Sequence, residues 1–172
     1  MAALEGGKYG IAFSSGMASA DSCMKLLRQG DHVVCCDDVY GGTARLFNNL
    51  MTNYGVEFTY VDSQVAENVQ KAIRPETKMV WVETPTNPLL KVTDLEAVGK
   101  IARSNDLLYV VDTTFATPVF LRPLEYGADL VLHSTTKYLS GHNQIIGGAV
   151  ITDRDDLYCL LYTSPSPRDV RS

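Results

Sequence analysis

Long apolar runs, clusters of basic residues and paired cysteines are scarce in this sequence, and each absence excludes a class of protein. No run approaches the roughly 20 apolar residues that a transmembrane helix needs, and the start, MAALEGGKYG, lacks the basic residues and apolar stretch of a secretory leader. We therefore expect no membrane contact and a cytoplasmic location. Basic residues do not cluster and the net charge is −5, which argues against a nucleic-acid partner.

The few cysteines and histidines do not have the spacing of a metal site. The four cysteines form no C-x-x-C pair, and Cys35 and Cys36 are adjacent within an apolar run. None of His32, His133 and His142 pairs with a cysteine at ligand spacing. We expect reduced thiols and no bound metal.

The glycine-rich motifs G-x-x-x-x-G-K-[ST] and G-x-G-x-x-G are also absent, which disfavours a nucleotide as ligand. At 172 residues, 45% hydrophobic and 20% charged, the chain has the composition of one soluble globular domain.

What the sequence does contain is an alternation of short apolar runs with stretches of helical periodicity. Near-continuous apolar strands between helices predict an α/β fold, a mainly parallel sheet with helices on both faces. The predicted strands begin at Tyr9 and span residues 32–36, 56–61, 78–82, 107–111, 130–132 and 145–151. The predicted helices follow Gly16 up to a cap at Gly30, span residues 44–54 and 64–73, run from an N-cap at Thr93 to near Asn105, and include a short helix at 118–126.

The apolar run at residues 130–132 ends at HSTTK, residues 133–137. In an open α/β sheet, ligands bind at the carboxyl ends of the strands. If the strand stays extended to Lys137, Ser134 and Thr136 point to one side and Lys137 to the other. Two hydroxyl donors with an amine nearby suit an anionic ligand that carries a carbonyl. A surface lysine after two turn-forming hydroxyls is the commoner meaning of such a segment alone.

Other predicted strands end in loops that carry candidate ligand-binding groups. Gly16 and Met17 stand where a helix begins, so their N–H groups could hold a phosphate, although many such turns use glycine only for backbone shape. Asp112 ends a very apolar strand, where a carboxylate suits a cationic partner or caps the residues that follow. Tyr40, beside two glycines, could stack on a flat ligand or be a plain turn residue. Asn87 could offer its amide to a ring oxygen or bond its own backbone.

One ligand would use all of these groups at once. Pyridoxal phosphate has a dianionic phosphate, a flat ring, a phenolic oxygen, a ring nitrogen that must be protonated and an aldehyde that condenses with lysine. The sequence offers one group for each, so we predict pyridoxal phosphate as the cofactor.

The same loops carry a resemblance. SSGMAS, DDVYGGT, ETPTNP, VVDTTF and HSTTKYLSGH, in this order and at these separations, resemble the Cys/Met-metabolism family of fold-type I pyridoxal-phosphate enzymes, the cystathionine γ-lyase and γ-synthase group. The resemblance implies that residues 1–158 are the large cofactor-binding domain, incomplete at both ends. We expect residues 159–172 to be a disordered, non-native tail of translated foreign sequence.

The resemblance also implies a role for each matching position. Lys137 is the lysine that forms the Schiff base and later moves protons, and Asp112 is the carboxylate that pairs with the pyridinium nitrogen. Tyr40 matches the tyrosine that stacks on the ring and takes part in leaving-group departure, and Asn87 matches the residue near the ring hydroxyl. The other implied cofactor contacts are the phosphate cradle of Gly16, Met17, Ser134 and Thr136, and two residues with less defined roles, Glu83 and Thr114.

The reaction implied by the resemblance is γ-elimination or γ-replacement on cystathionine or an activated homoserine, with a small sulfur amino acid as substrate. DDVYGGT looks more like the γ-lyase and γ-synthase branches than like methionine γ-lyase, which usually has a cysteine shortly after the tyrosine. Methionine γ-lyase and O-acetylhomoserine sulfhydrylase stay as alternatives. The parent is expected to be a homotetramer built from dimers.

The family also has segments without a counterpart here. An upstream tyrosine and arginine segment reaches the phosphate of a neighbouring subunit, and an arginine of the carboxyl-terminal domain holds the substrate carboxylate. We therefore expect this fragment to bind the cofactor but to be inactive alone. The alternative from another class is a non-enzymatic module that binds a different phosphorylated ligand at Gly16 and Met17.

Overall fold

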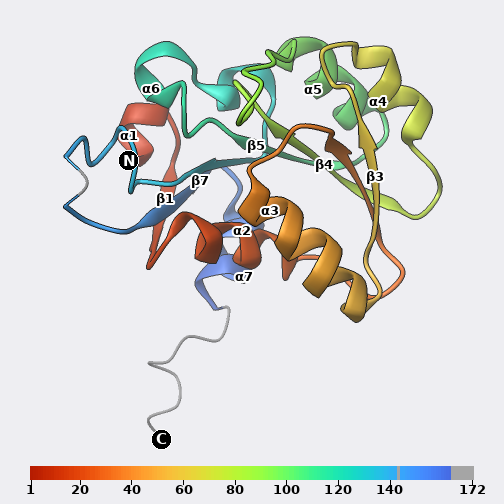
Figure 1. The fold of residues 1–172 in the computed structure, drawn as a ribbon, viewed down its shortest axis with the longest axis horizontal. Coiled ribbons are helices and arrows are strands. Elements are labelled where there is room, and N and C mark those ends of the chain that lie inside the picture. Colours follow the sequence, from red (N-terminus) through yellow and green to blue (C-terminus); the bar gives the residue numbers. More distant parts are fainter. Residues whose placement is uncertain (143, 164–172) are drawn as a thin grey trace, which may run out of the picture.

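A seven-stranded sheet in the order β1-β7-β6-β5-β4-β2-β3 runs through the computed structural model, which describes residues 1–142 and 144–163 (Figure 1). β7 is antiparallel to its neighbours β1 and β6, and the other pairs are parallel. The predicted mainly parallel α/β fold is therefore confirmed. The strands are β1 Tyr9–Phe13, β2 His32–Cys36, β3 Glu57–Val61, β4 Thr77–Glu83, β5 Leu108–Asp112, β6 Leu130–His133 and β7 Gly148–Thr152.

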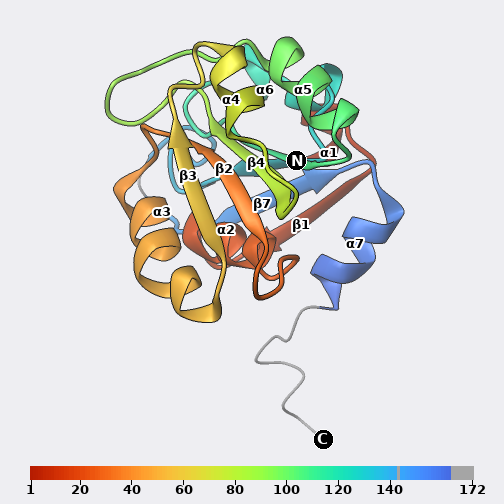
Figure 2. The same ribbon diagram turned by 90° about the vertical axis from the view of Figure 1, so that its right-hand side faces the viewer.

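Helices cover both faces of this sheet, as two separate buried cores and Figures 1 and 2 show. One face carries α2 Gly16–Met24, α3 Gly41–Arg45 and α7 Asp155–Tyr162. The other carries α1 Ala2–Glu5, α4 Ala66–Ala72, α5 Leu95–Ser104 and α6 Thr117–Phe120. A π-helical turn at Leu46–Leu50 and 3₁₀ turns at Met51–Tyr54 and Pro123–Tyr126 complete the helical elements. Within the described part of the chain, no helix is both long and apolar enough to cross a membrane.

The central strands are buried along their length because helices pack on both of their sides. Every residue of β2, β6 and β7 is buried. Trp81 of β4 is 0% exposed and meets Phe47 edge-on, with ring centroids 5.2 Å apart. Burial of such side chains stabilises the fold by roughly 1.5–3 kcal/mol each. This packing fixes the register that places Glu83 directly beside Asp112 at the strand ends.

The helix after β1 is shorter than predicted. α2 ends at Met24, so Gly30 does not cap it. Gly30 instead has φ 90° in the turn before β2, where its N–H donates to the Gly55 carbonyl at 2.8 Å. The predicted helix at residues 44–54 begins earlier, at Gly41, and changes from α-helical to π-helical and 3₁₀ turns along its length.

The N-cap of α5 is Asp94, one residue later than predicted. Its Oδ1 accepts a hydrogen bond from the Ala97 N–H at 3.0 Å. Thr93 is buried, and its hydroxyl bonds to that of Ser63 at 2.7 Å, so it cannot serve as the cap.

Two predictions near the C-terminal end were wrong in extent. β7 begins at Gly148 and not at residue 145, because Ile145 and Ile146 are exposed and lie outside the ladder. Residues 159–162, predicted to be disordered, belong to α7, because Leu157 and Leu161 are buried in the core. Residues 164–172 of the predicted tail lie outside the described residues.

Candidate active site

The segments that follow β1, β2, β4, β5 and β6 meet at one edge of the sheet and line a pocket of about 220 Å³. Every candidate residue chosen from the sequence lies in its wall: Gly16, Met17, Tyr40, Glu83, Asn87, Asp112, Thr114, Ser134, Thr136 and Lys137. The parallel topology brings them together, because parallel strands all end at the same edge.

Asp112 is a buried carboxylate at the end of β5. Its Oδ1 accepts hydrogen bonds from the N–H and the hydroxyl of Thr114, at 2.9 and 2.6 Å. The Thr114 Oγ1 in turn accepts from the Ser134 N–H at 2.8 Å, which ties the end of β5 to the end of β6. Burial raises the pKa of Asp112, against the opposing effect of the Thr114 bonds and of nearby His133. A cation in the pocket would favour the ionised carboxylate.

Glu83 is a second buried carboxylate, on the strand next to Asp112. Its Oε2 accepts from the Tyr40 N–H at 2.8 Å, and its own N–H donates to the Cys36 Sγ at 3.2 Å. Burial and the neighbouring Asp112 raise the pKa of Glu83 to about 8. Glu83 therefore holds the Tyr40 segment in place and is mostly protonated at neutral pH. Among the described residues, no group of three or more His, Cys, Asp or Glu side chains could hold a metal ion.

Two glycines allow close packing around the pocket. A Cβ on Gly16 would lie 2.6 Å from the Ser134 Cβ, so the first turn of α2 lies directly against the end of β6. A Cβ on Gly42 would lie 2.4 Å from the Tyr40 Cε1 and 2.9 Å from the Met17 Sδ. Gly42 thus leaves room for the Tyr40 ring beside Met17. The Ala18 N–H of α2 donates to the Ser15 Oγ at 3.0 Å, whereas the N–H groups of Gly16 and Met17 before it have no partner within the helix and are available as donors.

The segment that carries Lys137 is a turn, not an extended strand as one prediction required. β6 ends at His133, and the Lys137 N–H donates to the Ser134 carbonyl at 3.2 Å. Ser134, Thr136 and Lys137 therefore all line the pocket. The Thr136 hydroxyl donates to the Gly147 carbonyl at 3.1 Å and accepts from the Gly147 N–H at 3.0 Å, so it anchors this turn to the segment before β7.

Several lining residues were not singled out from the sequence. Phe115 and Pro85 directly follow Thr114 and Thr84 at two strand ends. Both lie in motifs already quoted, VVDTTF and ETPTNP, and this membership is the sequence signal that could have identified them. Of the remaining additions, Ser15 and Thr43 lie in the motifs SSGMAS and DDVYGGT, Leu132 ends the apolar run before HSTTK, and Ala20 has no distinguishing sequence feature.

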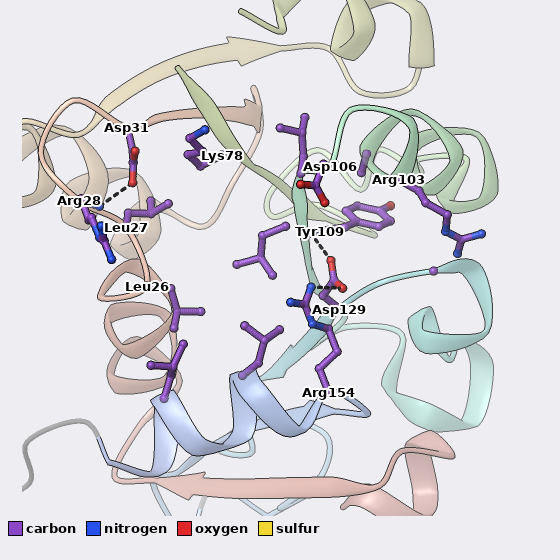
Figure 3. Close-up of a pocket in the computed structure, with 16 residues that line it drawn as sticks. Leu26, Leu27, Arg28, Asp31, Lys78, Arg103, Asp106, Tyr109, Asp129 and Arg154 are labelled. Atoms are coloured by element: carbon purple, nitrogen blue, oxygen red, sulfur yellow. Dashed lines mark hydrogen bonds and ion pairs between the residues drawn. The ribbon is translucent and has the colours of Figure 1, made fainter. Parts of the chain in front are cut away.

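A larger cavity of about 600 Å³ opens at the opposite edge of the sheet (Figure 3). Its charged side chains include Arg28, Lys78, Arg103 and Arg154. Arg154 donates to Asp129 at 3.1 Å, and both point into this cavity in Figure 3. It contains none of the candidate residues and lies at the amino ends of the parallel strands, so the smaller pocket is the candidate active site.

Comparisons with known proteins agree on the family. The sequence model of the family described as Cys/Met metabolism PLP-dependent enzyme matches residues 1–165. The chain is 49% identical over 158 residues to a probable cystathionine γ-synthase of Herpetosiphon aurantiacus, covering 92% of this chain and 50% of that protein. It is 47% identical over 162 residues to the cystathionine β-lyase MetC of Bacillus subtilis (strain 168), covering 94% of this chain and 42% of that protein.

A solved structure supports the same assignment. Cystathionine γ-lyase from Lactobacillus plantarum, complexed with L-serine, superposes with a TM-score of 0.92 at 45% identity, covering 93% of this chain and 42% of that one. The chain spans half or less of the length of these relatives. It belongs to the Cys/Met metabolism family of pyridoxal-phosphate-dependent enzymes.

Proposed function

We propose that the protein to which this chain belongs catalyses γ-elimination or γ-replacement on cystathionine or an activated homoserine, with pyridoxal phosphate as cofactor. The observation that carries the proposal is that Lys137, Asp112 and Tyr40, from three separate segments, line one pocket with the start of α2. The names of the similar proteins, γ-synthase, γ-lyase and β-lyase, support this class of reaction.

The residues of the pocket fit the cofactor chemically. The N–H groups of Gly16 and Met17, with Ser134 against them, offer donors to a phosphate. The buried Asp112 carboxylate suits a protonated ring nitrogen, and Tyr40 offers the face of its ring. When bound, pyridoxal phosphate supplies an electron sink for negative charge at the substrate α-carbon.

Lys137 is the proton carrier in this proposal. Its side chain lines the pocket from an exposed turn, and it forms no ion pair with any described residue. An amine that is not locked in an ion pair is free to bind the cofactor aldehyde and then to take and return protons at the substrate α-carbon. The bond from Thr136 to Gly147 keeps the backbone of this turn in place while the amine moves.

Reduction with borohydride tests the proposal. The chain is incubated with pyridoxal phosphate, the visible absorbance of the lysine-bound cofactor is recorded, and borohydride then makes the attachment permanent. Peptide mapping should find the cofactor on Lys137. Lys137→Ala should lose the band and the attachment, and Lys25→Ala, which removes an exposed lysine paired with Asp21 on α2, should keep both. Attachment at other lysines only, or none, would refute the proposal.

The products formed by the full-length protein show which carbon–sulfur bond it cleaves. γ-Elimination of cystathionine with water gives cysteine, 2-oxobutanoate and ammonia, whereas β-elimination gives homocysteine, pyruvate and ammonia. We place the protein in the γ branch because of the DDVYGGT segment. Methionine γ-lyase and O-acetylhomoserine sulfhydrylase remain the alternatives in the same family, and product analysis with methionine or O-acetylhomoserine separates them.

The 172-residue chain alone is proposed to bind the cofactor without turnover, since the resemblance places the substrate carboxylate clamp in a separate domain. Turnover of cystathionine by the purified chain would refute this. A phosphate-binding module of another kind is the competing function, supported by the Gly16 and Met17 N–H groups, which precede the capped Ala18 N–H at the start of α2. It predicts phosphate-ligand binding that Lys137→Ala does not change.

We further propose that the full-length protein is a cytoplasmic homotetramer built from dimers. Support for assembly comes from exposed apolar side chains, which mark interaction surfaces when they gather on one region. Those on the loop after β4, on α6 and before β7 are Leu89, Leu90, Val92, Val119, Phe120, Ile145 and Ile146. Sedimentation of the full-length protein tests the oligomer, and cell fractionation tests the location.

A further inference from the structure

A buried acid–histidine contact lies behind the pocket wall. Glu5, the last residue of α1, contacts the Nε2 of His133, the last residue of β6, through its Oε1. Both side chains are 0% exposed. The contact joins the N-terminal helix to the strand that leads directly into Ser134 and Lys137.

The contact lies on the face of the sheet opposite the pocket, because side chains alternate along a strand. Leu132 and Asp112 line the pocket, so the next residues, His133 and Thr113, point to the other side. Ala2 of α1 packs against the core of that other face, and Figure 1 shows α1 on the side of the sheet away from α2.

Glu5, His133 and Thr113 form one group, which we name the Glu5 cluster. The Thr113 Oγ1 lies 3.4 Å from the His133 Nε2. Thr113 directly follows Asp112, and His133 directly precedes Ser134. The cluster therefore joins, from behind, the same two strand ends that Thr114 joins on the pocket side.

Stability alone does not explain the Glu5 cluster. Among the described residues, the Glu5 Oε2 and the His133 Nδ1 have no hydrogen-bond partner. Buried polar atoms without partners cost free energy, and apolar side chains of similar volume are often as stabilising as a buried ion pair or more so. What the polar contact adds is a directional link between α1 and the end of β6.

We propose that Glu5 and His133 are positioning residues for the pocket. By linking the end of β6 to α1 and, through Thr113, to the end of β5, they hold Ser134 and Asp112 at the separation that the phosphate and the ring of the cofactor require. This inference rests on the proposed function, because it takes pyridoxal phosphate as the ligand.

The test separates positioning from stability. Glu5→Met with His133→Leu replaces the pair by apolar side chains, and of the Glu5 cluster only the Thr113 hydroxyl loses a partner, the 3.4 Å contact to His133 Nε2. Glu5→Gln keeps an oxygen acceptor and the side-chain size. The matched control is His32→Leu with Thr77→Val, which removes another buried histidine pair, 2.8 Å between His32 Nδ1 and Thr77 Oγ1, at the amino end of the sheet. Three quantities are measured: the urea midpoint, pyridoxal phosphate affinity and amide exchange.

In the Glu5→Met/His133→Leu variant we expect a urea midpoint close to that of the wild type. Cofactor affinity should fall about tenfold, and amide exchange at Thr114 and Ser134 should quicken about tenfold, the size expected for losing one contact of a network. Glu5→Gln should keep part of the cofactor affinity and part of the exchange protection that the double variant loses. The control pair should shift the urea midpoint and leave cofactor affinity and these two amides unchanged.

Unchanged affinity and unchanged exchange at Thr114 and Ser134 in a folded double variant would overturn the proposal. If the double variant does not fold, Glu5→Gln decides by the same two readouts. If the wild type does not bind pyridoxal phosphate, the proposed function fails, and amide exchange alone decides whether the Glu5 cluster fixes the strand ends.

Discussion

Glu83 and Asp112 occupy directly paired positions on the neighbouring parallel strands β4 and β5, so two buried carboxylates stand side by side at the pocket. Both cannot ionise without mutual repulsion in a poorly solvated site. The pKa of each is raised, and burial is the largest cause in both. In the proposed enzyme a protonated ring nitrogen would favour ionised Asp112, which leaves Glu83 as the carboxyl that keeps its proton.

The first prediction concerns stability against pH. The pKa of Glu83 is about 8 in the folded chain and near 4.5 when unperturbed. Between these values the unfolded chain releases a proton that the folded chain keeps, so Glu83 lowers stability as pH rises from about 4.5 to about 8. Glu83→Gln should reduce this loss of unfolding free energy by on the order of 2 kcal/mol. Urea unfolding of the cofactor-free chain between these pH values measures the unfolding free energy.

Glu96→Gln is the control for this series, since Glu96 is exposed on α5 and paired with Lys100. It should leave the pH dependence unchanged. A Glu83→Gln profile as steep as that of the wild type would show that Glu83 does not hold its proton in the folded chain.

A second prediction uses adjacent glycines at the pocket. Gly42→Ala places a Cβ against the Tyr40 ring and the Met17 sulfur and should displace the ring, lowering pyridoxal phosphate affinity about tenfold, as a lost aromatic contact of 0.5–1.5 kcal/mol allows. Gly41→Ala meets nothing closer than the Arg45 Nη1, at 3.6 Å. It should bind the cofactor normally. Equal affinities for the two variants, measured by absorbance titration, would mean that Tyr40 does not contact the cofactor.

The candidate residues chosen from the sequence line one pocket because they are tied to strand ends. Apolar runs such as the one before Asp112 marked the strands, and parallel topology then required their ends to meet. Lys137, Asp112 and Tyr40 could be chosen because one ligand needed all three chemistries. The five-segment pattern also led to the family that the comparisons show.

What sequence reasoning missed depends on tertiary contacts. Thr93 and Asp94 are both good N-caps, and only the buried bond from Thr93 to Ser63 decides between them. The turn at Lys137 is fixed by the bonds of Thr136 to Gly147 on the segment before β7, which no local pattern indicates. Glu5 was not singled out from the sequence, because nothing local indicates that it is buried against His133.

A third prediction concerns packing away from the pocket. Gly99 lies inside α5, where alanine is normally favoured over glycine by roughly 0.5–1 kcal/mol. Here a Cβ would lie 2.2 Å from the Tyr126 carbonyl oxygen, a backbone atom that cannot turn aside. Gly99→Ala should therefore destabilise the chain by about 1–3 kcal/mol. Thermal unfolding measures the change, with Gly41→Ala as the helical glycine that has space. A stabilised Gly99→Ala chain would mean that the Pro123–Tyr126 turn moves freely away from α5.

The last prediction concerns His32, which is buried between Thr77 and Thr59, with its ring nitrogens 2.8 and 2.9 Å from their hydroxyls. Burial lowers the pKa of His32 below 6.5, and the nearby Arg74 adds to this effect. The unfolded chain therefore binds a proton below pH 6.5 that the folded chain refuses, so His32 lowers stability as pH falls. The pH dependence of stability that His32 contributes is therefore opposite in sign to that of Glu83. The His32 contribution is the difference between Glu83→Gln and Glu83→Gln/His32→Gln, because Asp112, whose pKa is raised and whose effect has the opposite sign, is present in both. From pH 7 to pH 5 the variant with His32 should lose on the order of 1 kcal/mol relative to the variant without it, and parallel pH profiles would show that His32 causes no fall.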